Sequence, residues 1–109
     1  MNRVLTRSMT SSVTERLKIV HDRKNFAFRA LLNESEVGHL EYRLNGSGTN
    51  HIVDFNHTYT DPIAQGKGIA ANMVKAGLVW ARENKFRIIP SCSYVAAYIE
   101  KNPEWKSSL

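Results

Sequence analysis

The apolar residues of this chain change their period once, and that change constrains the fold more than any other feature of the sequence. Over residues 17–58, apolar and polar side chains alternate at a period of two, which is typical of strands with one buried face. After Pro62 the apolar residues recur at helical spacing, from Ile69 to Trp80. We therefore expect an α+β domain in which most of a sheet is complete before the main helix begins.

Short polar segments divide the alternating region into strands. The turn candidates are residues 23–24, 33–36 and 45–48. The last of these is rich in residues that accept a positive φ. A four-stranded antiparallel meander is the simplest arrangement that follows. In its fourth strand, within residues 51–58, the alternation predicts that Val53, Phe55 and His57 share one face.

The second half of the chain predicts two helices with a short strand between them. The helical pattern covers residues 67–84, and the apolar run at residues 86–89 suits a fifth, buried strand. The long helix would then connect the fourth and fifth strands as a right-handed crossover. Ser91 or Ser93 could cap a closing helix, which Pro103 would end.

Length and composition exclude several classes of protein. A chain of 109 residues has room for one domain, and it contains no apolar run long enough to span a membrane. The single cysteine, Cys92, excludes an internal disulfide and argues against a secreted disulfide scaffold. The formal net charge is +5, but the basic residues are scattered. This balance suits an anionic small molecule, with nucleic acid as the alternative.

Residues 1–15 differ in composition from the rest of the chain. They carry Arg3 and Arg7 among many serines and threonines, with no acid before Glu15. This is the composition of a mitochondrial or plastid transit peptide, and a flexible N-terminal tail accounts for it equally well. The expected location is therefore cytoplasmic, or organellar if the segment is a transit peptide. We expect the domain itself to comprise residues 16–109.

The most informative stretch is Gln65-Gly66-Lys67-Gly68-Ile69-Ala70, between the predicted fourth strand and the long helix. Glycines let the backbone turn sharply and approach a ligand closely. The free N–H groups at a helix N-terminus favour an anion, and Lys67 adds a positive charge. Small Ala70 leaves the first turn of the helix open to a ligand. The stretch predicts a site for a phosphate-bearing molecule, and a plain turn before a helix is the alternative.

Other common sites for phosphate or metal are not supported. The chain has no G-x-x-x-x-G-K-[ST] motif, which argues against a P-loop nucleotide hydrolase. It also has no G-x-G-x-x-G after a first strand, which argues against a dinucleotide-binding Rossmann domain. Finally, His21, His39 and His51 show no metal-ligand spacing with Cys92, so no metal site is indicated.

Within the glycine turn, Gln65-x-x-Gly68-x-Ala70 resembles the Q/R-x-x-G-x-G/A signature of the GNAT acyltransferase superfamily. The likeness extends over residues 17–105 and is strongest to a short, single-domain group of GNAT-type N-acetyltransferases. The matching pieces are Val20-His21-Asp22 with Phe26, His57-Thr58, Gly66-Lys67-Gly68-Ile69-Ala70, Pro90-Ser91-Cys92-Ser93-Tyr94-Val95, and Asn102-Pro103. The resemblance implies a minimal GNAT fold that lacks the additional helices and strands that usually wall the acceptor site.

The resemblance also implies a ligand and the residues that bind it. Acetyl-CoA would be the acyl donor, with its pyrophosphate on the amides of the glycine turn and its acyl-pantetheine in a gap between the fourth and fifth strands. The coenzyme-binding residues would be Thr58, Tyr59, Thr60, Gln65, Gly66, Lys67, Gly68, Ile69 and Ala70. The acyl carbonyl would lie near the turn that contains Cys92. The acyl acceptor would be an amine of unknown identity, either a small amine or polyamine or a lysine or N-terminus on a protein.

Four residues are candidates for the chemistry. Cys92, expected near a helix N-terminus, could contact the thioester or carry the acyl group, since such a thiol has a depressed pKa. His57 could accept the proton of the incoming amine. Tyr94 or Tyr98 could protonate the departing thiolate. For each of them a purely structural role is the alternative, as a buried cysteine, a sheet histidine or core tyrosines.

Two other functions compete with catalysis. The chain could bind coenzyme A or acyl-CoA without turnover, which the lack of acceptor walls favours. It could instead be a small basic nucleic-acid-binding protein, although it has no basic stripe with interleaved aromatic residues.

Overall fold

A five-stranded mixed sheet forms the centre of the protein. The computed structural model describes residues 15–46 and 51–109. Its strands are β1 (Leu17–Asp22), β2 (Ala27–Leu32), β3 (Ser35–Asn45), β4 (Ile52–Thr60) and β5 (Arg87–Ile89). The first four pair antiparallel in chain order, and β5 joins β4 in parallel. The predicted meander and the α+β class are thereby confirmed. Residues 1–14 of the N-terminal segment and part of the predicted turn at residues 45–48 lie outside the described residues.

Local conformations explain how the early strands connect. The 3-10 turn η1 (Arg23–Asn25) joins β1 to β2. Asn33 and Glu34 join β2 to β3 with φ angles of 51° and 72°. Two consecutive residues with positive φ form the hairpin turn whose twist matches that of the strands beside it. The predicted turn at residues 33–36 is therefore a two-residue hairpin.

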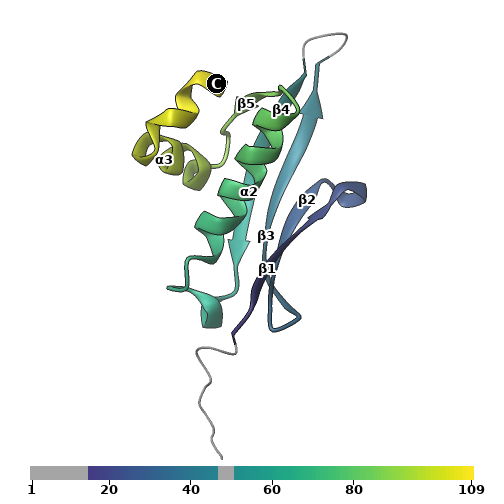
Figure 1. Cartoon of the computed structure of the whole chain (residues 1–109), viewed down its shortest axis with the longest axis vertical. Helices are drawn as coiled ribbons and strands as arrows, with labels where there is room; N and C mark the ends of the chain where they lie inside the picture. Colours follow the sequence, from purple (N-terminus) through teal and green to yellow (C-terminus); the bar gives the residue numbers. More distant parts are fainter. Residues whose placement is uncertain (1–14, 47–50) are drawn as a thin grey trace, which may run out of the picture.

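The helix α2 (Ile69–Glu83) packs along one face of the sheet, as Figure 1 shows. Its buried side chains are Ile69, Met73, Val74, Leu78 and Ala81. Gly77 brings the helix close to the sheet, because a Cβ placed there would lie 2.9 Å from both Leu40 Cδ2 and Phe55 Cε1. The helix begins two residues later than predicted, since Gly68 has a left-handed φ of 73° and cannot be part of it.

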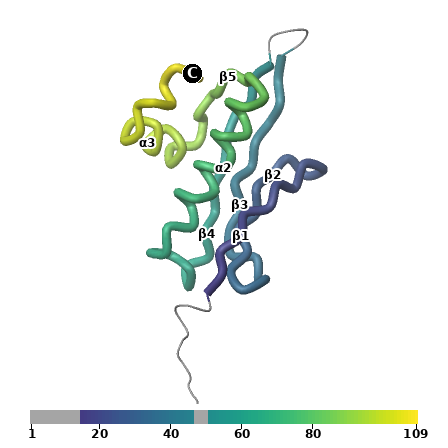
Figure 2. Tube along the Cα trace, viewed as in Figure 1, coloured from purple at the N-terminus to yellow at the C-terminus, as the bar shows by residue number. Residues whose placement is uncertain are grey.

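The chain ends with α3 (Ser93–Lys101) and the 3-10 turn η3 (Pro103–Ser108), which lie on the β5 side of the sheet (Figures 1 and 2). The predicted stop at Pro103 is confirmed. The predicted cap is wrong: Cys92, not Ser91 or Ser93, is the N-cap residue, and Ser93 already belongs to the helix. The backbone N–H of Cys92 donates to Phe55 O over 2.9 Å, which fixes Cys92 in an extended conformation just before the helix.

One further prediction, the facing of His57, is also wrong. The β3–β4 register shifts so that Tyr42 pairs with Phe55 while Glu41 pairs with His57, which leaves Asn56 as a bulge. A bulge adds one residue and therefore reverses the side-chain alternation beyond it. Val53 and Phe55 are buried on the helix side, whereas His57 is exposed on the opposite face.

Within residues 15–46 and 51–109, none of the helices combines the length and the apolar composition that a membrane-spanning helix needs.

Candidate functional site

The glycine turn forms a backbone cradle at the start of α2. Asp61 caps the start of the preceding 3-10 turn η2 (Pro62–Ala64), because its carboxylate accepts a hydrogen bond from the N–H of Ile63 over 3.1 Å. Gly66 and Gly68 then have φ angles of 84° and 73°, which L side chains rarely adopt. Between residues 66 and 71, no backbone N–H donates to another described residue. These free amides at a helix N-terminus suit an anionic ligand.

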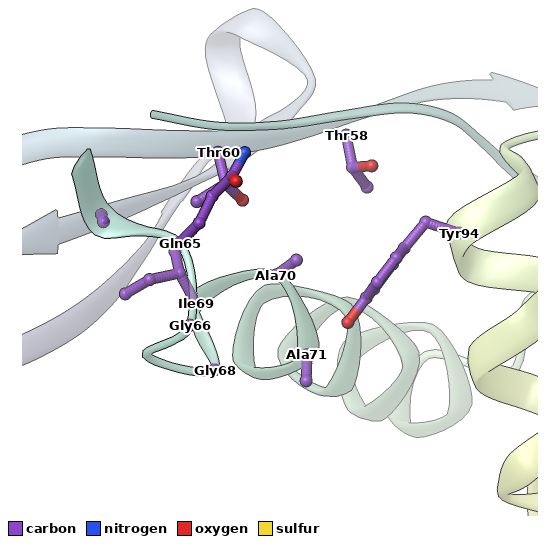
Figure 3. A pocket seen from close by; sticks show the side chains of 10 residues that line it. Thr58, Thr60, Gln65, Gly66, Gly68, Ile69, Ala70, Ala71 and Tyr94 are labelled. Carbon is purple, nitrogen blue, oxygen red and sulfur yellow. The ribbon is translucent and has the colours of Figure 1, made fainter. Parts of the chain in front are cut away.

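A pocket of about 360 Å³ adjoins this cradle. Figure 3 shows its walls: Thr58 and Thr60 come from β4, the small side chains of Ala70 and Ala71 come from α2, and Tyr94 extends from α3 toward α2. The other lining residues are Ala64, Gln65, Gly66, Gly68 and Ile69. The pocket is therefore continuous from the backbone cradle to the edge of β4.

The gap implied by the GNAT resemblance has a counterpart in the pairing of β4 and β5. The ladder between these strands covers three residue pairs and ends at Asp54 with Ile89. One further hydrogen bond, from the N–H of Cys92 to Phe55 O, closes the end of the gap. Beyond that point, β4 continues through Thr60 while the chain leaves β5 for α3. From Asn56 to Thr60, β4 is paired with β3 on one edge only. Its other edge, on the side of β5, has no partner strand among the described residues and borders the pocket.

Cys92 lies at the closed end of this gap, half-buried. Its Sγ is 3.5 Å from the hydroxyl of Thr58, which lines the pocket. Burial acts to raise the pKa of the thiol, but the Thr58 hydroxyl and the nearby backbone N–H groups of Val95, Tyr94 and Thr58 favour the thiolate. Their combined effect is larger, so the pKa of Cys92 is lowered. A thiolate is thus accessible more readily here than at an ordinary cysteine.

The structure brings together most, but not all, of the predicted site residues. Seven of the nine predicted coenzyme-binding residues line the pocket: Thr58, Thr60, Gln65, Gly66, Gly68, Ile69 and Ala70. Lys67 belongs to the cradle, but its side chain points to Glu15, with Nζ 3.0 Å from Glu15 Oε2. Tyr59 lies on the opposite face of the sheet, next to His39, with ring centroids 5.5 Å apart.

The chemical candidates separate in space. Tyr94 lines the pocket, whereas Tyr98, one turn further along α3, is half-buried against the core, and burial raises its pKa. His57 lies across the sheet from the pocket, 5.6 Å from His39 between ring centroids. Cys92 and Thr58 are therefore adjacent on the pocket side of the sheet. His57 precedes Thr58 in β4, and its side chain projects from the opposite face.

Sequence reasoning missed two lining residues and one charged contact. Ala64 and Ala71 complete the pocket wall, and their small size beside a glycine turn was the signal that could have indicated them. Glu15 contacts Lys67 across 52 positions of sequence, a pairing that no local pattern indicates. Among the described residues, no three His, Cys, Asp or Glu side chains come together to hold a metal ion.

The same arrangement of sheet and helices occurs in a known acetyltransferase. An aminoglycoside acetyltransferase from an uncultured soil metagenomic sample, solved in complex with trehalose, matches with a TM-score of 0.57 at 19% identity. The match covers 78% of this chain and 59% of that one, so this chain spans less than two thirds of its length. At this identity the likeness shows the fold, which is the minimal GNAT fold that the sequence predicted.

Sequence comparison identifies the family. Residues 26–108 match the family model for the GCN5-related N-acetyl-transferase, so the chain belongs to the GCN5-related N-acetyltransferase family. A relative in Gallus gallus, Protein NATD1, is 32% identical over 88 residues, which cover 80% of this chain and 77% of that protein. Protein NATD1 of Homo sapiens is 31% identical over 88 residues, covering 80% and 75% respectively.

Proposed function

We propose that this chain is an acetyl-CoA-dependent N-acetyltransferase with an amine as acceptor. One observation carries the proposal: a cradle of free amides at the start of α2 opens directly onto the unpaired edge of β4, which ends beside a thiol of lowered pKa. An anion site, an extended backbone edge and a polarisable group in that order fit the three parts of an acyl-CoA. Membership of an acetyltransferase family supports the same reaction.

In this proposal the coenzyme lies along the pocket from cradle to thiol. Its pyrophosphate accepts hydrogen bonds from the amides of residues 66–71, where the helix dipole also favours negative charge. Its pantetheine amides pair with the free backbone groups of β4 between Asn56 and Thr60. From Phe55 to Thr60 the strand spans about 17 Å, which suits an extended pantetheine arm. The thioester then lies near Thr58 and Cys92.

The transfer forms one bond, breaks one bond and needs two proton transfers, one away from the amine and one to the departing sulfur; exchange of a proton with solvent then restores the two groups that took part. A neutral amine attacks the thioester carbonyl, the C–N bond forms, and the C–S bond breaks as the tetrahedral intermediate collapses. Backbone N–H groups at the closed end of the gap favour the oxyanion. The Tyr94 phenol, on the pocket wall, is the candidate to protonate the departing thiolate. His57 is the candidate to take the proton from the amine.

The position of His57 gives the acceptor a direction of approach. The helix side of the gap is occupied by α2 and, in this proposal, by the coenzyme. The opposite face carries exposed His57 and Tyr59 with half-buried His39. An amine that approached from this face would meet the acyl carbon from the side opposite the coenzyme, with His57 beside it.

Two routes of transfer compete within the proposal. In direct transfer the amine attacks acetyl-CoA itself, and Cys92 only contacts the thioester. In the two-step route the Cys92 thiolate attacks first, releases coenzyme A and forms S-acetyl-Cys92, from which the amine then takes the acetyl group. Intact-protein mass after incubation with acetyl-CoA separates the routes. A gain of one acetyl group that is absent in Cys92→Ala supports the second route, and an unchanged mass supports the first.

The proposed coenzyme site can be tested by calorimetric titration of coenzyme A and acetyl-CoA into wild type, a variant that blocks the pocket and a matched control variant. Ala71→Trp places an indole into the pocket from a helical residue with normal backbone, and Ala97→Trp makes the same change at an exposed position of α3. We expect coenzyme A and acetyl-CoA to bind wild type and Ala97→Trp and not Ala71→Trp. Equal binding to all three proteins, or binding to none of them, would refute the proposed site.

A second function, binding of acyl-CoA without turnover, is favoured by one observation. On the sheet face with His57 and Tyr59 both of these side chains are exposed and His39 is half-buried, so an acceptor there would lie on an open surface. A screen of amines with acetyl-CoA distinguishes the two functions through the release of free coenzyme A thiol. Coenzyme binding without thiol release for any amine would favour the binding module.

A further inference from the structure

Glu15 and Lys67 form a contact that the proposed reaction does not explain. Lys67 Nζ lies 3.0 Å from Glu15 Oε2 and 3.3 Å from Glu15 Oε1. Both side chains are partly exposed, at 40% for Lys67 and 39% for Glu15. Lys67 stands between Gly66 and Gly68 and is the only basic residue in the segment from residue 61 to residue 71. The single cation of the cradle is therefore paired with an internal carboxylate.

The chain next to Glu15 is held in place. The N–H of Arg16 donates to Asn33 Oδ1 over 2.9 Å, and the N–H of Asn33 donates to Arg16 O over 2.9 Å. This two-way contact fastens the residue after Glu15 to the β2–β3 hairpin. The backbone beside Glu15 is therefore fixed to the sheet near the glycine turn, so pairing with Lys67 has to order only the two side chains and not the chain as well.

A phosphate and the Glu15 carboxylate compete for the same ammonium group. An anion on the cradle amides gains from a free positive charge at Lys67, and loses part of that gain while Glu15 neutralises it. The carboxylate also adds a negative charge close to any bound phosphate. Both effects reduce affinity, and both act at short range, within the screening length of physiological salt.

We infer that Glu15 belongs to the coenzyme site as an internal competitor anion, which pairs with Lys67 in the free protein and lowers the affinity for phosphate-bearing ligands. This inference rests on the proposed function, because it takes coenzyme A as the ligand. Glu15 thereby determines affinity without being part of the pocket wall. Binding transfers Lys67 from the carboxylate to a phosphate group.

Calorimetric titration of coenzyme A into four proteins tests the inference: wild type, Glu15→Gln, Lys67→Met and the double variant. We expect Glu15→Gln to tighten binding about two- to five-fold, the range that ion pairs of this exposure carry. The same change in the Lys67→Met background should tighten binding clearly less, because only the direct repulsion between the carboxylate and the phosphate is then relieved. Glu83→Gln is the matched control, because it removes one negative charge from an exposed position at the far end of α2.

The possible outcomes separate the inference from the proposal beneath it. A larger gain from Glu15→Gln in wild type than in Lys67→Met, with no change in Glu83→Gln, supports the inference. If coenzyme A binds wild type and Glu15→Gln with equal affinity, the inference is wrong and the proposed function is unaffected. An equal gain with and without Lys67 overturns it as well, since the effect would then be general electrostatics. Absence of binding to every variant overturns the proposed function and this inference together.

Discussion

Gly38 on β3 links the stability of this protein to the shape of its site. The residue is buried beneath the first turns of α2 and pairs with Thr60 on β4. A Cβ placed at Gly38 would lie 2.7 Å from the carbonyl oxygen of Tyr59, 3.2 Å from Met73 Cε and 3.5 Å from Ile69 Cγ2. The contact with the Tyr59 oxygen is about 0.7 Å shorter than ordinary van der Waals contact. That oxygen belongs to the backbone, so β4 itself must move to admit a methyl group.

The cost of Gly38→Ala follows from these contacts. Overpacking of this kind costs about 1–3 kcal/mol. Removing a glycine from a strand returns about 0.5–1 kcal/mol. The upper part of the overpacking range applies because the 2.7 Å contact is with backbone, so we expect the free energy of unfolding to fall by about 1–2 kcal/mol net, and the Tm to fall by about 4–8 °C for each of these kcal/mol. Because the displaced residues border the gap, the affinity for coenzyme A should fall as well.

Gly77→Ala is the comparison that makes this prediction sharp. Its Cβ would lie 2.9 Å from the nearest atoms, but these belong to the side chains of Leu40 and Phe55 rather than to the backbone. Alanine in a helix also returns about 1 kcal/mol of propensity. Thermal unfolding followed by circular dichroism should therefore show a smaller loss for Gly77→Ala than for Gly38→Ala. An unchanged Tm in Gly38→Ala, or a larger loss in Gly77→Ala, would refute the reasoning.

Three further predictions concern single side chains. Thr58→Val should raise the pKa of the Cys92 thiol, because a hydroxyl that favours the thiolate is lost. The pH profile of alkylation by iodoacetamide should therefore shift to higher pH, and an unshifted profile would contradict this. Burial lowers the pKa of His21, so as the pH falls the unfolded chain takes up a proton at this residue before the folded protein does. The Tm of wild type should therefore fall as the pH drops below about 6.5, and the Tm of His21→Phe should fall much less over the same range. Arg82 donates to Glu104 O over 2.8 Å, and its guanidinium lies 4.1 Å from the Trp105 ring centroid. Arg82→Met should therefore lower the free energy of unfolding by about 1 kcal/mol and speed amide hydrogen exchange in η3, whereas unchanged exchange there would argue against this contact.

Periodicity predicted the meander and both helices because each depends on which side chains are buried. Alternation at a period of two follows from one buried sheet face, and the stripe from Ile69 to Ala81 follows from a helix packed on that face. The glycine turn was also readable, since a positive φ at Gly66 and Gly68 leaves a signature in residue type. These features come from local sequence acting on local backbone.

The facing of His57 was not predictable in the same way. The bulge at Asn56 is set by how β4 pairs with β3, and nothing in the composition of β4 marks where one residue is left over. A single added residue nevertheless moves every later side chain to the other face, so Thr58 and Thr60 reach the pocket while His57 and Tyr59 leave it. The pairing of Glu15 with Lys67 escaped prediction for a related reason: it depends on long-range folding.

The gap itself follows from how the chain leaves β5 after Ile89. Arg87 donates its N–H to His51 O, so alternate residues of β5 face β4, and a regular parallel ladder would next use the N–H of Ser91 to reach Phe55 O. Cys92 instead gives its own N–H to Phe55 O and, as the N-cap, turns the chain into α3 and away from β4. The edge of β4 beyond Phe55 loses its neighbour because of the same residues that place a thiol beside it. The site is therefore a consequence of where this strand ends rather than of any one reactive side chain.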